Sequence, residues 1–123
     1  PGVRNDPGHH PPHLFKYSTL DNLPDCVAIH LNDTHPVLAI PEMMRVMLDE
    51  CGYTWEAAWD IVTRTTAYTN HTVMAEALEC WNEELFKFRL PRIYQIVQEI
   101  NRRFCESMHQ RHVTATKWAV WPR

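Results

Sequence analysis

The sequence predicts an α/β fold with one or two parallel strands and about four helices. The segment CVAIHL, residues 26–31, is short, apolar and rich in β-branched residues, and it follows the breaker Pro24-Asp25, which is typical of a buried parallel strand. Longer segments after it repeat apolar residues at helical spacing between helix-start and helix-stop residues. With 123 residues, 45% of them hydrophobic, the chain has about the length of one domain and enough apolar side chains for a core.

Two helices follow the strand. Pro41 suits the first position of a helix and Gly52 suits its end, which predicts a helix over about 41–51. Thr54 suits the N-cap of the next helix. There the apolar positions fall at i, i+3, i+4 and i+7, which predicts a stripe that faces the core: Trp55, Ala58, Trp59 and Val62. The segment Thr66–Thr69 after this helix is the candidate for a second strand.

Two more helices are predicted before the end of the chain, over about 75–89 and 92–109, with a break at Pro91. Each carries apolar residues on one face, which we interpret as core. In the first helix they are Leu78, Trp81, Leu85 and Phe88, and in the second they are Ile93, Ile96, Val97, Ile100 and Phe104.

The two ends differ from this central part. Residues 1–17 are rich in Pro, Gly and His without any periodicity and predict an irregular arm, and residues 110–123 predict an irregular tail. The ordered segment is therefore expected over 18–109. Because one or two strands leave backbone donors and acceptors unpaired, we expect this segment to be part of a larger α/β layer.

Composition excludes several classes of function. No secretory signal and no run of about 18 apolar residues is present, so we expect a cytoplasmic protein without a membrane partner. The four cysteines form no CxxC pair, which predicts free and mostly buried thiols rather than a zinc or redox site. The segment from Lys87 onward is basic, but its charges lie among apolar positions without an aromatic stacking platform, so we expect no nucleic-acid partner.

Two polar corners follow the two candidate strands. LNDTHP places Asn32, Asp33 and His35 after the first strand, and AYTNHT places His71 and Thr72 after the second. Ligand sites in open α/β sheets lie at the carboxyl ends of parallel strands. The same residue types also satisfy local turns, and the two interpretations have equal weight.

Several chemistries compete for these corners. If the strand ends are neighbours, Asp33 can accept a hydrogen bond from His71 and orient its ring; a core histidine is the equal alternative. A metal site from Asp33, His35 and His71 is disfavoured because no HxH or HExxH pair is present. A cysteine nucleophile lacks an activating motif. Sugar or polyol recognition fits best, with Glu76 and Glu79 at the start of the following helix as further partners for hydroxyl groups.

Three segments resemble one known family. LPDCVAIHLNDTHPVLAIPEMMRVMLDE, TWEAAWDIVTRTTAYTNHTVMAEALECW and LPRIYQIVQEINRRF are similar to a continuous internal segment in the N-terminal domain of the α-glucan phosphorylases, which act on glycogen, starch or maltodextrin. The chain resembles the bacterial type of glycogen phosphorylase. The resemblance runs from about Leu20 to Phe104.

The resemblance implies a Rossmann-like domain of the glycosyltransferase-B type, in an enzyme far longer than this chain. Such enzymes use phosphate to release glucose 1-phosphate from the terminal α-1,4-linked glucose of a glucan, contain pyridoxal 5'-phosphate and are typically homodimers. It also implies site roles. His71 matches the histidine that contacts the glucose 6-hydroxyl, Asp33 and His35 match residues on the glucan side, and Thr72, Glu76 and Glu79 match neighbours in the same cavity.

No segment matches the catalytic residues or the lysine that holds the cofactor. The chain alone is therefore expected neither to bind pyridoxal phosphate nor to turn over glucan. The alternative expectation is a small carbohydrate-binding or interaction module without catalysis.

Overall fold

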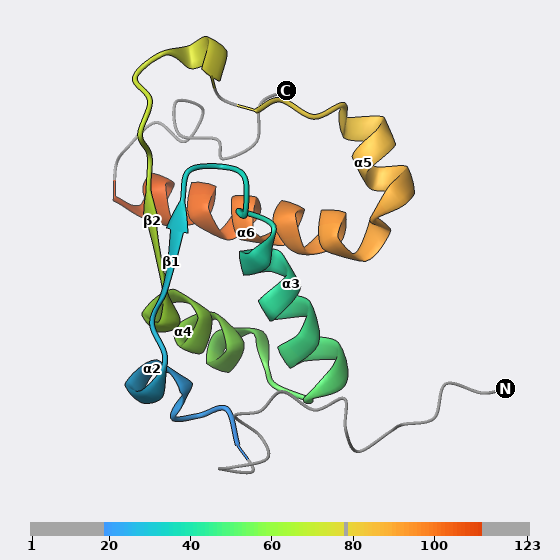
Figure 1. Cartoon of the computed structure of the whole chain (residues 1–123). Coiled ribbons are helices and arrows are strands. Elements are labelled where there is room, and N and C mark those ends of the chain that lie inside the picture. The colour runs from blue at the N-terminus through green and yellow to red at the C-terminus, as the bar shows by residue number, and fades with distance from the viewer. Residues whose placement is uncertain (1–18, 78, 112–123) are drawn as a thin grey trace, which may run out of the picture.

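The computed structural model describes residues 19–77 and 79–111. The arm expected over 1–17 and nearly all of the tail expected over 110–123 lie outside these residues. The described part is mixed α/β, with a two-stranded parallel sheet at one side of a group of helices (Figure 1). Its elements are, in order, α2 (Leu23–Cys26), β1 (Ile29–Asn32), α3 (Ala39–Arg45), η2 (Val46–Glu50), α4 (Trp55–Thr65), β2 (Thr66–Thr69), η3 (Ala75–Ala77), α5 (Glu83–Arg89) and α6 (Pro91–Gln110).

The sheet contains both strands that the sequence indicated. β1 and β2 pair in parallel with Ile29 opposite Thr66 and Asn32 opposite Thr69, and they lie side by side in Figure 1. The first strand begins three residues later than expected. Pro24 stands at the start of the helical turn α2 rather than acting as a breaker, since proline is tolerated in a first turn.

The helix after β1 begins two residues before its expected start, so that Pro41 is its third residue and is buried. Its last turn, η2, is π-helical, with the N–H of Cys51 donating to the carbonyl of Val46 at 3.0 Å. The helix stops at Gly52, as expected, because this residue has a φ of 73° that glycine adopts without a steric penalty.

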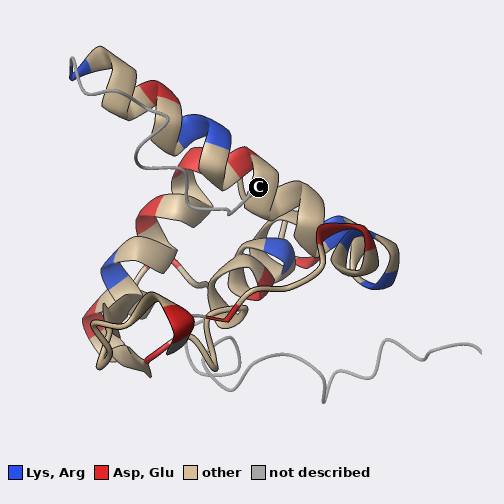
Figure 2. Cartoon of the chain, turned by 90° about the horizontal axis from the view of Figure 1, so that it is seen from above, with Lys and Arg blue, Asp and Glu red and all other residues tan. Residues whose placement is uncertain are grey.

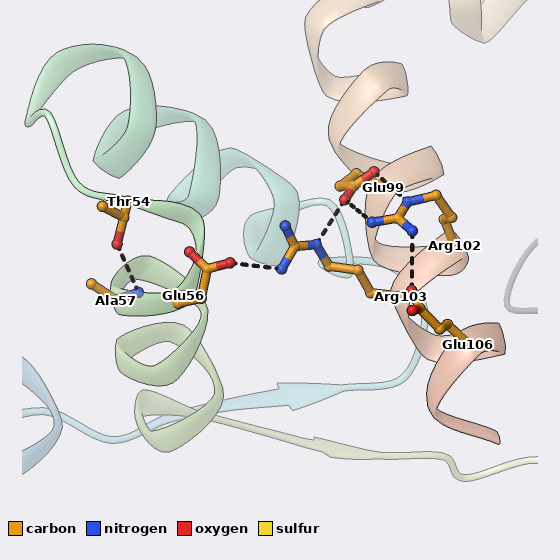
Figure 3. A network of polar contacts seen from close by, with 7 residues as sticks. All are labelled: Thr54, Glu56, Ala57, Glu99, Arg102, Arg103 and Glu106. Carbon is orange, nitrogen blue, oxygen red and sulfur yellow. Dashed lines mark hydrogen bonds and ion pairs between the residues drawn. The ribbon is translucent and has the colours of Figure 1, made fainter. Parts of the chain in front are cut away.

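The core lies between α3, α4 and α6. Thr54 caps α4 by accepting a hydrogen bond from the N–H of Ala57 at 3.3 Å (Figure 3). Of the predicted α4 stripe, Ala58 and Val62 are buried, whereas the stacked pair Trp55 and Trp59 lies at the margin of the core. The buried cluster consists of Leu20, Met44, Met47, Ala58, Ile61, Val62 and Ile96.

The prediction of a single helix over 75–89 is wrong. The short turn η3 is followed by extended chain, and a new helix, α5, begins after Asn82, whose side chain accepts from the N–H of Leu85 at 2.9 Å. Asparagine in an extended conformation favours such a helix start over a helix interior. Glu76 and Glu79 therefore do not share the first turn of a helix.

The apolar face assigned to that helix is also wrong for the residues the structure describes. Trp81, Leu85 and Phe88 are 46%, 56% and 78% exposed, and Leu78 lies outside the described residues. The buried residue of α5 is Phe86, whose ring meets those of Trp81 and Tyr94 edge-on at 5.5 and 6.1 Å.

The last helix agrees with the prediction over nearly its whole length. Ile93 and Ile96 are buried, and the other residues of the expected face, Val97, Ile100 and Phe104, are half-buried. None of the helices in the described part of the chain is long and apolar enough to cross a membrane. The cysteines, all of which are described, are free thiols as expected, but the expectation that most of them are buried is wrong, because Cys26 and Cys80 are exposed and Cys51 and Cys105 are half-buried.

A network of ion pairs joins α6 to α4 (Figure 3). Arg103 bridges Glu99 at 2.7 Å and Glu56 at 3.1 Å, and its guanidinium lies 4.9 Å from the ring centroid of Trp55. Arg102 bonds Glu99 at 2.8 Å and Glu106 at 3.1 Å. These pairs form because acidic and basic residues alternate along α6 (Figure 2).

We expect this network to make stability depend on pH. Hydrogen bonds from Arg102 and Arg103 lower the pKa of Glu99 to about 2, below its value in the unfolded chain. The contribution of the ionised Glu99 side chain to the free energy of unfolding is therefore complete above pH ~4.5, and it is lost as the pH falls towards 2. Glu99→Gln should lower the melting temperature by a few degrees at pH 7 and by less at each step below pH ~4.5. Circular dichroism melts at several pH values measure this difference.

Glu106→Gln is the matched control, because Glu106 contacts Arg102 alone in this network. At neutral pH, Glu106→Gln should lower the melting temperature by less than Glu99→Gln does. A Glu99→Gln deficit that stays constant from pH 7 to pH ~2.5 would contradict the role given to the lowered pKa.

Candidate functional site

The parallel sheet brings the two polar corners together, as the sequence indicated. Asn32 and Thr69 are register partners at the carboxyl ends of β1 and β2. The N–H of Asp33 then donates to the carbonyl of Thr69 at 2.8 Å, which extends the pairing one residue into the corner. LNDTHP and AYTNHT thus begin from adjacent points of one sheet edge.

Asp33 holds its corner in an unusual backbone conformation. It has a φ of 64°, a left-handed value that Asp tolerates better than most residues. Its Oδ1 accepts a hydrogen bond from the N–H of Thr34 at 2.8 Å. Within the described residues no hydrogen bond joins Asp33 to His71, so the orientation of the His71 ring by Asp33 is not formed here. Local turn chemistry therefore occupies one carboxylate oxygen, and the other makes no hydrogen bond within the described residues.

The second corner combines turn chemistry with an exposed histidine. Asn70 Oδ1 accepts from the N–H of Thr72 at 3.0 Å, and Thr72 Oγ1 accepts from the N–H of Met74 at 3.2 Å. The His71 side chain is exposed and makes no hydrogen bond to any residue that the structure describes. The alternative that His71 is a buried core histidine is therefore wrong, and both ring nitrogens are available to a ligand.

Two other predicted site residues meet across the chain. His35 Nδ1 lies 3.3 Å from Glu79 Oε1, with side-chain exposures of 77% and 39%. Glu76, on η3, is exposed and has no polar partner among residues 19–77 and 79–111. The geometry thus pairs His35 with Glu79, and Glu76 stands apart.

A groove of about 330 Å³ begins beside this pair and was not expected from the sequence. Thr34 and Glu79 are the polar residues that line it. The rest of its wall is apolar and comes from several helices and the segment before α5, including Pro41, Trp59, Trp81, Val97 and Ile100. Trp59, Trp81 and Val97 all belonged to predicted core faces, so helical spacing alone did not distinguish a groove wall from a core.

One further polar contact was not expected. His30 and Thr69 form a side-chain hydrogen bond across the two strands, on the exposed face of the sheet. This contact links the end of β2 to β1 just before the two corners. In the described part of the chain, the two corners included, no three His, Cys, Asp or Glu side chains are grouped so that they could hold a metal ion.

Comparison with known proteins identifies the family. The family model described as carbohydrate phosphorylase matches residues 12–120. The chain belongs to the carbohydrate phosphorylase family. The resemblance found in the sequence is thereby confirmed.

Relatives of this phosphorylase-family chain are named glycogen phosphorylase. The protein of Bacillus subtilis (strain 168) is 51% identical over 96 residues, which cover 78% of this chain and 12% of the relative. The protein of Pasteurella multocida (strain Pm70) is 53% identical over 94 residues, 76% of this chain and 12% of the relative. The human muscle form is 56% identical over 87 residues, 71% of this chain and 10% of that protein. The chain thus spans about an eighth of the length of the bacterial relatives.

Proposed function

We propose that this chain forms the glucose-facing wall of the active site in an α-glucan phosphorylase. The reaction of the whole protein is the phosphorolysis of a terminal α-1,4-linked glucose to glucose 1-phosphate. Relatives named glycogen phosphorylase support the reaction class. The observation that carries the local role is the backbone hydrogen bond between Asp33 and Thr69, which holds the two corners side by side.

The six candidate residues suit the hydroxyl groups of a sugar. His71 offers a ring nitrogen to the 6-hydroxyl of the bound glucose, because its ring is exposed and unpaired within the described residues. Asp33 and His35 face the glucan side, where the second carboxylate oxygen of Asp33 accepts from a hydroxyl group. Thr72, Glu76 and Glu79 add donors and acceptors around them, with Glu79 also orienting the ring of His35.

Pyridoxal 5'-phosphate does not fit the residues that the structure describes. The single lysine among them, Lys87, lies on α5 with its ammonium 5.7 Å from the ring centroid of Tyr94. The groove has an apolar wall and one carboxylate, Glu79, and no basic group to hold a phosphate. We place the cofactor, the phosphate and glucose 1-phosphate site and the catalytic residues in other parts of the phosphorylase polypeptide.

The same proposal extends to the larger sheet and the whole protein to which this segment belongs. Within the described residues β1 and β2 pair only with each other, so each has one free edge. Further strands on these edges would complete a Rossmann-like sheet of the glycosyltransferase-B type. We also propose a cytoplasmic, homodimeric enzyme that acts on α-1,4-glucan and has neither a membrane nor a nucleic-acid partner.

A segment exchange tests the proposed role. Residues 12–120, which the family model matches, would replace the corresponding segment of the Bacillus subtilis glycogen phosphorylase, and phosphate-dependent release of glucose 1-phosphate from maltoheptaose would be measured. We expect activity from the chimera and none from the isolated 123-residue chain. A folded chimera without activity, or release of glucose 1-phosphate by the isolated chain, would contradict the proposal.

A second candidate is a self-standing carbohydrate-binding module. The buried cluster around Met44 and Val62 favours it, because the described residues have a core of their own. Isothermal titration of the isolated chain with maltoheptaose, combined with thermal unfolding, separates the two. Micromolar binding by a cooperatively folded chain supports the module, and no binding at millimolar glucan supports the phosphorylase segment.

A further inference from the structure

Polar contacts, rather than core packing, hold the carboxyl ends of the two strands together. Leu31 is the last buried residue of β1, with 3% of its surface exposed. None of residues 32–35 is buried, and none of residues 66–74 is buried. The placement of one corner relative to the other therefore depends on the contacts that the strand ends make with each other.

Thr69 contacts β1 through both its backbone and its side chain. Its carbonyl accepts a hydrogen bond from the N–H of Asp33 at 2.8 Å. Its Oγ1 forms a hydrogen bond with Nε2 of His30. Because a threonine hydroxyl both donates and accepts, this second bond forms whichever ring nitrogen carries the proton. The last residue of β2 is thus fastened to β1 at two points.

The bond between His30 and Thr69 is diagonal and favours one register of the strands. The register partner of His30 is Ala67, and that of Thr69 is Asn32. Residues two apart on a strand share a face, and diagonal neighbours across two strands lie within reach of a long side chain. A slip of one residue would place His30 and Thr69 on opposite faces of the sheet and break the bond.

We propose that His30 is a positioning residue for the glucose wall. Its bond to Thr69 fixes the strand ends and thereby the placement of His71 relative to Asp33, because Thr69 precedes His71 by two residues and also holds the Asp33 amide. His30 acts through the strand ends and not on the sugar. This inference rests on the proposed function, in which Asp33 and His71 contact the same bound glucan.

Hydrogen exchange of the Asp33 amide in the full chain tests the structural part of this proposal. His30→Leu removes the ring nitrogens and should accelerate exchange about 2- to 10-fold, the range for the loss of one hydrogen bond. His30→Gln should restore the slow rate, because the glutamine amide also donates and accepts. An Asp33 exchange rate that is the same in the wild type and in His30→Leu would overturn the proposal.

A double-mutant cycle in the segment-exchange chimera tests the functional part. His30→Leu and Thr69→Val should each lower kcat/KM about 2- to 10-fold. The double variant should lose no more than either single variant, since both remove the same bond. His30→Gln should retain the activity of the unmodified chimera. Additive losses from His30→Leu and Thr69→Val would overturn the proposal.

Thr66→Val is the matched control, at the other end of β2. The Thr66 hydroxyl donates to the carbonyl of Val62 at 2.7 Å and does not reach β1. Thr66→Val should therefore leave the Asp33 exchange rate and kcat/KM unchanged. A loss of kcat/KM equal to that of Thr69→Val would overturn the proposal, because any weakening of the strand would then suffice.

The same measurements separate this inference from the proposed function. A chimera whose kcat/KM responds to His71→Ala and not to His30→Leu would overturn the role of His30 alone. An inactive chimera would contradict the proposed function, while the Asp33 exchange rates would still decide whether His30 holds the strand ends.

Discussion

Met44→Ala is expected to lower the free energy of unfolding by about 2–5 kcal/mol, the range for deleting a large buried side chain. Met44 is 0% exposed on α3 and belongs to the buried cluster formed with α4 and α6. The truncation leaves a cavity at the place where these helices meet. Because a domain of this size is stabilised by only about 5–15 kcal/mol, this loss is a large fraction of the total. Urea unfolding followed by circular dichroism measures it.

Met74→Ala is the matched control. It removes the same atoms from a side chain that is 62% exposed in the segment after β2, so the expected change is within about 0.5 kcal/mol. Equal losses from the two variants would show that Met44 does not lie at the centre of a packed core.

His71→Ala is expected to lower kcat/KM of the segment-exchange chimera about 10- to 100-fold. The reason is the loss of one hydrogen bond to a glucose hydroxyl, which leaves the sugar group without its partner and removes about 1.4–2.7 kcal/mol of transition-state binding. Because His71 has no packing or hydrogen-bonding role within the described residues, melting temperature should not change. Initial rates of glucose 1-phosphate release at subsaturating maltoheptaose give the ratio directly.

His109→Ala provides the comparison for this variant. His109 is also an exposed histidine, but it lies in the last turn of α6, away from both corners. The kcat/KM of the chimera that carries His109→Ala should equal that of the unmodified chimera. An active chimera whose kcat/KM does not respond to His71→Ala would remove His71 from the proposed glucose wall.

Local sequence signals predicted the elements whose ends are set by local chemistry. Thr54 and Gly52 mark helix ends because an N-cap hydroxyl and a left-handed φ act within a few residues. Asn82 carried the same kind of signal, but the apolar spacing on both sides of it favoured one continuous helix. Pro24 is ambiguous in a sequence, because it both breaks strands and begins helices.

The candidate site was predictable where it depended on strand order and unpredictable where it depended on the path of the chain. Adjacent corners follow from a parallel pair of strands. The contact between His35 and Glu79 depends on how the extended segment before α5 returns to the sheet edge, and no local rule determines that path. The exposure of Phe88 is likewise a tertiary property, since spacing shows only that a face exists.

The pairing of β1 with β2 also has a consequence for local stability. The two strands are separated along the chain by α3, η2 and α4, and closing such a loop is entropically costly. The short sheet also has exposed residues in both strands, which is typical of elements with low local stability. We therefore expect the amides of the polar corners to exchange faster than those of the helical core, so that their exchange rates report on the integrity of the proposed glucose wall.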